Sequence, residues 1–196
     1  MFGINADLQS QITYLTKVIT LNDVLFRVIE KANKIDLDDY YIGAGCIAQT
    51  IWNYQTGLEL THGISDIDIV YYDDSDLSLE AEKAVIQRIT SVMNPCEIRL
   101  DIKNQARVHL WYKEHFGYDI IPYNSIENAI NSWPTTATSI GVRMGNNKLK
   151  VYAPFGLNDL FGMIVRANKT QITEEIYLQK VKKWSERWPS LTVIPW

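Results

Sequence analysis

Residues 65–72 read Ser-Asp-Ile-Asp-Ile-Val-Tyr-Tyr, and this stretch decides the fold class. A run so rich in β-branched and aromatic residues is typical of a strand. Because successive side chains of a strand point to opposite faces, Asp66 and Asp68 share one face while Ile67 and Ile69 share the other. Two like charges side by side on a partly buried sheet are unfavourable unless a positive charge neutralises them. The stretch therefore predicts a strand that begins with an acidic pair suited to a cation.

Two further Asp-x-Asp pairs, Asp36/Asp38 and Asp74/Asp76, lie in polar connections. Aspartate is common in such segments because its side chain bonds to the backbone of a turn. We interpret both pairs as solvated turn residues, so the spacing alone does not indicate a site.

A second strand is predicted over residues 97–103, where apolar and polar residues alternate strictly. Its apolar positions share one face, and Asp101 lies on the other. If this strand neighbours the first, Asp101 comes against the acidic pair. Three carboxylates on one sheet face suit two hard cations such as Mg²⁺. Glu97 shares the polar face and is the next candidate for the third carboxylate.

A glycine-rich turn precedes the acidic strand in the sequence. Gly43-Ala44-Gly45 follows a short extended run at residues 40–42 and opens a predicted helix that ends at Gly57. The exposed N–H groups of a helix N-terminus are suited to phosphate. The turn therefore supplies the anion-binding element that three carboxylates lack.

The remaining pattern mixes helices and strands without regular alternation. Strands are predicted over residues 139–144 and 148–152, and helices over residues 21–32, 79–93, 105–115, 125–133, 157–165 and 174–188. No linker or repeat divides the chain. We expect one domain over residues 1–196, with a helical N-terminal segment at residues 1–38. The fold class is α/β (α+β), a mixed sheet flanked by helices.

Composition excludes several classes of protein. Of the 196 residues, 46% are apolar and 21% charged, so the chain can bury a core and is not disordered. With a formal charge of −4, the chain lacks the excess of basic residues on which non-specific nucleic-acid binding depends. No apolar run is long enough for a membrane span, and residues 1–7 do not resemble a signal peptide. With two cysteines and no metal-knuckle spacing, we expect a protein of the reducing cytoplasm.

The order of these motifs resembles the DNA polymerase β-like nucleotidyltransferase superfamily. More closely, the chain resembles a bacterial family of nucleotidyltransferase-like proteins of unknown function. The resembling segments are residues 43–53, 65–71, 104–111, 153–160 and 188–189. The resemblance implies a nucleotidyltransferase fold and transfer of a nucleoside monophosphate from an NTP to an acceptor, a small molecule or a protein. It also implies dependence on Mg²⁺ or Mn²⁺.

The resemblance assigns roles to particular residues. Asp66, Asp68 and Asp101 would hold the metals and act in catalysis. Residues Gly43, Ala44, Gly45 and Cys46 would form the nucleotide-binding turn, in which Gly45 lets the backbone approach the triphosphate.

The chain also departs from the superfamily pattern. Cys46 stands where the superfamily often has Ser, and a thiol is a poorer hydrogen-bonding group. Ala48-Gln49 stand where the tRNA nucleotidyltransferase branch has Arg-Asp. Together with the negative net charge, this argues against a nucleic-acid partner.

Other residues near the motifs have simpler interpretations. Asn104 and Arg107 follow the second strand directly, so we expect them to contact the nucleotide. His109 is interpreted as a hydrogen-bonded structural residue. The basic residues of the last predicted helix are interpreted as a solvated face: Lys180, Lys182, Lys183 and Arg187.

Two alternatives to an active transferase stay open at this point. The first is a catalytically inactive module of the same fold that binds nucleotide and metal. The second is metal-dependent phosphohydrolysis, which three carboxylates also permit, because a fold alone does not settle a function.

Overall fold

A five-stranded mixed sheet forms the centre of the protein in the computed structural model, which describes residues 3–35, 37, 39–146 and 148–196. Asp36 and Asp38 lie outside the described residues. The strands are β1 (Tyr40–Gly43), β2 (Asp66–Tyr71), β3 (Arg99–Asn104), β4 (Gly141–Gly145) and β5 (Lys148–Tyr152). Their order is β3-β2-β1-β4-β5, in which β2 and β3 are parallel and the other neighbours antiparallel. The predicted mixed sheet is therefore confirmed.

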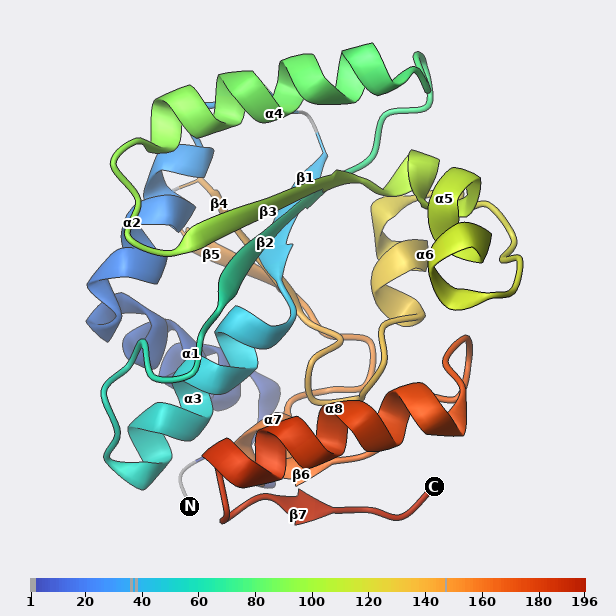
Figure 1. Cartoon of the computed structure of the whole chain (residues 1–196). Helices are drawn as coiled ribbons and strands as arrows, with labels where there is room; N and C mark the ends of the chain where they lie inside the picture. The colour runs from blue at the N-terminus through green and yellow to red at the C-terminus, as the bar shows by residue number, and fades with distance from the viewer. Residues whose placement is uncertain (1–2, 36, 38, 147) are drawn as a thin grey trace.

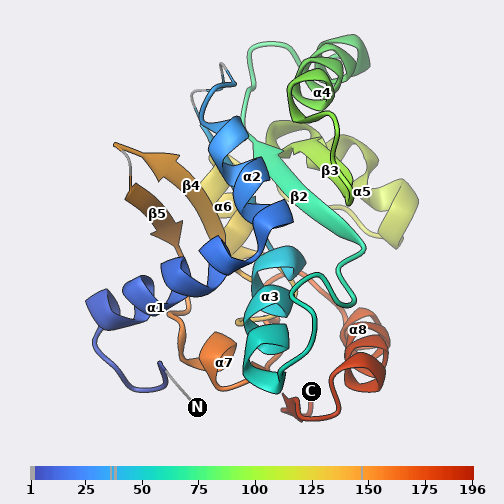
Figure 2. The same ribbon diagram turned by 90° about the vertical axis from the view of Figure 1, so that its left-hand side faces the viewer.

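Helices flank both faces of this sheet (Figures 1 and 2). They are α1 (Leu8–Leu21), α2 (Asp23–Ala32), α3 (Gly45–Thr56), α4 (Leu79–Met93), α5 (Val108–Phe116), α6 (Ile126–Asn131), α7 (Asn158–Phe161) and α8 (Glu174–Arg187), with a short 3-10 helix, η1 (Gln105–Arg107). Figure 2 shows α1, α2 and α3 on one face, with α5 and α6 behind the sheet. Among the described residues, no helix has the length and apolarity that a bilayer crossing requires.

The two faces of β2 have different environments, as the alternation in its sequence predicts. Ile67 and Ile69 are fully buried in the main core, against the face covered by α3. Val70 lies on the opposite face, in a smaller cluster with Ile126 and Ile130 of α6. The acidic residues share this second face, where α6 covers only the far end of the strand.

Helix α8 is anchored through its tryptophans. Trp184 and Trp188 pack edge-to-face on Trp52 of α3, with ring centroids 5.7 and 5.6 Å apart. The indole N–H of Trp188 also donates a 2.7 Å hydrogen bond to Asn53. These contacts place both tryptophans in the core, and they fix α8 against the helix that begins at the glycine turn.

Two parts of the structure differ from the expectations. The helix expected over residues 157–165 ends after α7, because Met163 adopts a positive φ of 53°. The chain then forms β6 (Ile164–Val165), which pairs in parallel with β7 (Thr192–Val193). At the other end of the chain, the helical segment expected over residues 1–38 contains α1 in addition to the helix expected over residues 21–32, and Asn22 caps α2.

Candidate functional site

The glycine turn, the acidic pair and Asp101 lie next to one another in the sheet. Asp68 pairs with Gly43 across β1 and β2, and with Asp101 across β2 and β3. Asp66 lies two residues before Asp68 on the same strand face. The register therefore places the glycine turn beside the acidic pair, and Asp101 beside Asp68 on the adjacent parallel strand. We call Asp66, Asp68 and Asp101 the acidic row.

The two outer carboxylates are paired with cations of β3. Arg99 Nη2 lies 2.5 Å from Asp66 Oδ2, and the Lys103 ammonium forms an ion pair with Asp101. Among the described residues, no hydrogen bond or ion pair involves the carboxylate of Asp68. The central acid of the row is thus the one without a direct partner.

The environment of Asp68 opposes its ionisation. Burial raises the pKa of Asp68 to about 7, and the nearby charges of Asp66 and Asp101 add to the shift. The ammonium groups of Lys103 and Lys180 act in the opposite direction but do not cancel it. A further positive charge at this position would favour the ionised carboxylate.

The donor set is of the kind that hard divalent cations prefer, since it consists of carboxylate oxygens. Within the part of the chain that the structure describes, however, no three His, Cys, Asp or Glu side chains are grouped so as to hold a metal ion. Asp66 is paired with Arg99 and Asp101 with Lys103. A cation held by all three carboxylates therefore competes with two internal ion pairs.

The glycine turn is shaped by close approaches of the backbone. A Cβ on Gly43 would lie 2.3 Å from the carbonyl oxygen of Ile140 and 3.0 Å from the Trp133 ring, so only glycine fits. Ala44 adopts a φ of 59° and provides no side-chain cap for α3. The first N–H groups of α3 are consequently left for a ligand.

Cys46 is directed away from that ligand position. Its thiol donates to the carbonyl oxygen of Gly43 at 3.1 Å, and the residue is 1% exposed. Burial raises the pKa of the Cys46 thiol well above its usual range. The side chain at this position therefore stabilises the turn.

Asn104 and Arg107 are not brought to the acidic row. The Asn104 amide donates to the Asp73 carbonyl oxygen at 2.7 Å and accepts from the Asp73 N–H at 3.1 Å. The Arg107 guanidinium forms a buried ion pair with Glu82 of α4 and donates to the Leu77 carbonyl oxygen at 2.9 Å. Both side chains connect the end of β3 to α4 and the loop before it.

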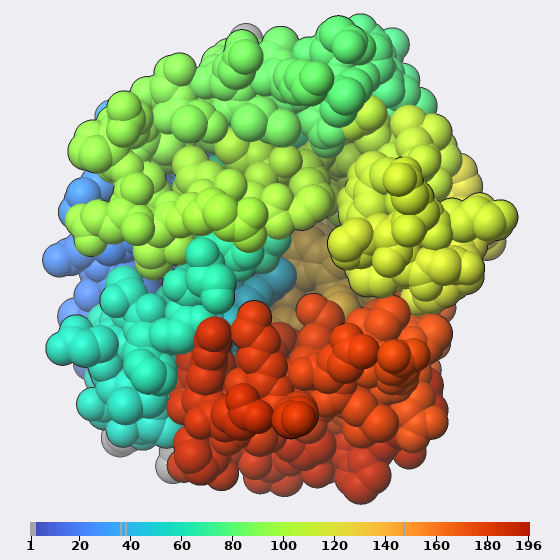
Figure 3. Space-filling view, in the orientation of Figure 1, coloured from blue at the N-terminus to red at the C-terminus, as the bar shows by residue number. Residues whose placement is uncertain are grey.

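A cavity of about 280 Å³ lies next to the acidic row, and Ala44, Asp68 and Lys103 contribute to its wall. Aromatic residues form much of the rest: Trp111, Tyr112, Phe116, Tyr123 and Trp133. In the space-filling view the surface is hollowed between α5 and α8 (Figure 3). The cavity thus opens between these two helices, with the acids at one side.

A nucleotidyltransferase family profile, described as "Nucleotidyltransferase", matches residues 30–193 of the chain. The chain belongs to this nucleotidyltransferase family. A solved structure whose description reads "The NMR structure of the protein reveals a CCA-adding enzyme head domain" has the same fold. It is 21% identical, the match covers 94% of this chain and 96% of that one, and the TM-score is 0.76. A search of curated proteins finds no match.

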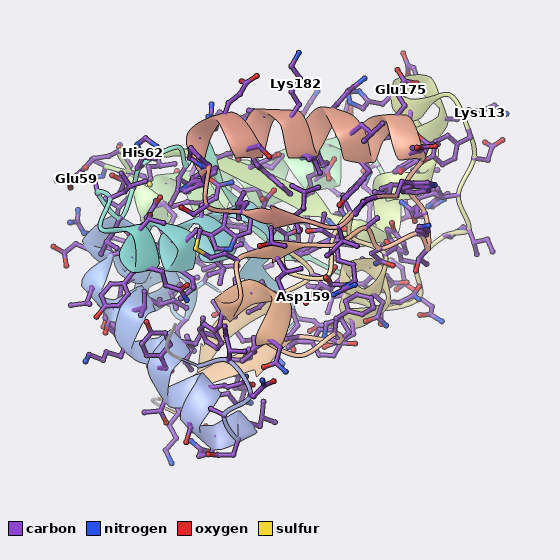
Figure 4. The ribbon with its side chains drawn as sticks, turned by 90° about the horizontal axis from the view of Figure 1, so that it is seen from below. Glu59, His62, Lys113, Asp159, Glu175 and Lys182 are labelled. Atoms are coloured by element: carbon purple, nitrogen blue, oxygen red, sulfur yellow. The ribbon has the colours of Figure 1, made fainter. Side chains whose placement is uncertain are left out.

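The sequence interpretation of Lys180 in this nucleotidyltransferase was wrong. Lys180 lines the cavity together with Asp68, and burial lowers the pKa of its ammonium, while Asp68 opposes that shift. Lys182 stands on the outer side of α8 and points away from the protein (Figure 4). The signal was present in the spacing, because Lys180 lies three residues after buried Tyr177 and four before buried Trp184.

Proposed function

We propose that the protein transfers a nucleoside monophosphate from an NTP to a hydroxyl of a small molecule or protein, in a reaction that requires Mg²⁺ or Mn²⁺. The family membership supports nucleotidyl transfer in general. The observation that carries the finer proposal is the register that aligns Gly43, Asp68 and Asp101 on three adjacent strands. It sets a helix N-terminus suited to phosphate beside carboxylates suited to hard cations.

In this proposal the protein binds the triphosphate through the N–H groups at the start of α3 and the ammonium of Lys180. Asp66, Asp68 and Asp101 would hold divalent cations, which supply charge neutralisation and Lewis-acid polarisation of the phosphates. The acceptor oxygen attacks the α-phosphorus, and the bond from that phosphorus to the bridging oxygen of the β-phosphate breaks, releasing pyrophosphate. The Asp101 carboxylate takes the proton of the acceptor hydroxyl.

We also infer a cytoplasmic setting and an acceptor other than nucleic acid. Cys46 and Cys96 are both free thiols, as expected in a reducing compartment. The formal charge of −4 offers no general attraction for a polyanion.

Replacing Lys180 by Met is expected to weaken NTP binding about tenfold, because it removes a charge-assisted contact to the triphosphate. The matched control is Lys182→Met, which removes the same charge from the outer side of the same helix and should leave the affinity within twofold. Isothermal titration calorimetry with Mg²⁺ and each NTP measures both. Equal effects of the two substitutions would assign the loss to net charge alone.

NTP and metal together are expected to raise the melting temperature far more than either alone. A ligand that binds only the folded protein stabilises it by mass action, by about 2.7 kcal/mol at a concentration 100 times the Kd. Differential scanning fluorimetry with NTP, with Mg²⁺, with both, and with NTP in EDTA tests this. An equal shift in EDTA would show that the carboxylates do not mediate binding.

The transfer step itself is tested by incubating the protein with Mg²⁺ or Mn²⁺, each labelled NTP and a cell extract. Labelled products, or label on the protein, support the enzyme. One observation favours an inactive binding module as the second candidate: both Asp66 and Asp101 are already held by internal cations. Metal-dependent NTP binding without transfer to any acceptor would establish that module.

A further inference from the structure

The cavity beside Asp68 is lined by the polar side chain of Gln105. Gln105, the first residue of η1, is only 5% exposed and lines this cavity. Its side-chain amide forms no hydrogen bond with any residue that the structure describes. The nitrogen and oxygen of this amide are accessible from the cavity rather than sealed inside the protein. The amide of Gln105 is therefore available to hydrogen-bond with a ligand in the cavity.

The wall around Gln105 is suited to a flat ligand. Trp111, Phe116 and Trp133 present aromatic surface to the cavity. Tyr123 is held in place, since its hydroxyl lies 2.8 Å from the Ser132 hydroxyl and 2.9 Å from the Gln171 side-chain oxygen. A volume of about 280 Å³ is at the lower end for small-molecule sites, so it accommodates one ring system and not a polymer.

The cavity also lies within reach of the proposed phosphate position. Ala44, immediately before α3, and Asp68 both contribute to its wall. The Trp133 ring packs so closely on the glycine turn that a Cβ at Gly43 would lie 3.0 Å from it. A group in the cavity is thus adjacent to the element proposed to bind the triphosphate. In an NTP, a single ribose joins the planar base to the phosphates.

We propose that this cavity binds the nucleobase of the donor NTP and that Gln105 recognises the hydrogen-bonding edge of the base. The inference rests on the proposed function. A glutamine amide offers a donor and an acceptor side by side, which is the arrangement that pairs with the edge of adenine in nucleic-acid recognition. Stacking on aromatic rings supplies sequence-tolerant affinity, so the amide decides which base is preferred.

The test compares NTPs with inorganic tripolyphosphate, which has the phosphates but no base. Calorimetric titrations with Mg²⁺ should show that the unmodified protein binds at least one NTP ten times more tightly than tripolyphosphate. Gln105→Leu should reduce that advantage about tenfold and leave tripolyphosphate affinity unchanged. The control is Gln87→Leu on the exposed side of α4, which should behave as the unmodified protein.

A second substitution keeps the test decisive if Gln105→Leu does not fold. Gln105→Glu replaces the donor by an acceptor, so the preference should move toward guanine, whose edge presents two adjacent donors. Equal affinity for NTPs and tripolyphosphate in the unmodified protein, or an unchanged base preference in both Gln105 variants, would overturn the inference. Tripolyphosphate binding that is absent, or insensitive to Asp66→Asn/Asp68→Asn, would overturn the proposed function itself.

Discussion

Asp101→Asn is expected to reduce nucleotidyl transfer at least 100-fold while NTP binding persists. The substitution conserves size and much of the hydrogen-bonding capacity, so β3 should stay intact, but it removes the carboxylate proposed to take the acceptor proton. Losses of two or more orders of magnitude are typical when a positioned proton acceptor or electrostatic stabiliser is removed. Single-turnover transfer assays and calorimetric NTP titrations measure the two quantities separately.

The double substitution Asp66→Asn/Asp68→Asn provides the contrast. It should abolish metal-dependent NTP binding as well as transfer, because the acidic pair is proposed to hold the cation that accompanies the triphosphate. Unchanged transfer in Asp101→Asn would move the third carboxylate elsewhere, with Glu97 as the next candidate. Although the structure begins β3 at Arg99, Glu97 precedes it by two residues and remains near the same edge.

Asp68→Asn is expected to stabilise the metal-free protein at alkaline pH, although it removes a proposed catalytic group. The pKa of Asp68 is raised to about 7 from an ordinary value of 3.8, principally by burial. Between these pH values the folded protein binds a proton that the unfolded chain does not, so the free energy of unfolding falls as pH rises through this range. Asparagine avoids the loss, and at pH 8 we expect a gain of about 2–4 kcal/mol.

Urea denaturation in EDTA at pH 4.5 and pH 8 measures this effect. The stability difference between Asp68→Asn and the unmodified protein should be large at pH 8 and small at pH 4.5. Asp119→Asn, at an exposed carboxylate paired with Lys113, is the control and should show little dependence on pH. If Asp68→Asn were the less stable protein at pH 8, burial would not be opposing the ionisation of Asp68.

The sheet and the acidic row were predictable because their signals are local. Strict alternation in two short segments assigns Asp66, Asp68 and Asp101 to faces, and the structure places them accordingly. The β6–β7 pair was not predictable, since each strand has two residues and their pairing depends on the chain returning after α8. The helix α1 had a signal, because Ile12, Leu15 and Ile19 recur at helical spacing.

The directions of individual side chains were the part that sequence did not reveal. Asn104, Gln105 and Arg107 lie within four residues, yet Gln105 alone of the three lines the cavity. The partners that hold Asn104 and Arg107 away from the cavity are distant in sequence, since Asp73 binds Asn104 and Glu82 binds Arg107. Lys180 was missed for a different reason, because its basic neighbours suggested a solvated face and concealed its place on the buried stripe.

The anchoring of α8 against α3 has a consequence for the order in which a newly synthesised chain acquires its site. By residue 104 the ribosome has made the glycine turn and all three carboxylates. The aromatic residues of the cavity wall follow by residue 133, and the ammonium of Lys180 only when the chain has been extended to residue 180. Until Trp184 has also been added, the side of the cavity that α8 supplies is missing, since the contact of Trp184 with Trp52 fixes α8 against α3. Nucleotide binding at full affinity therefore requires α8 in place, whereas formation of the β1–β3 sheet does not.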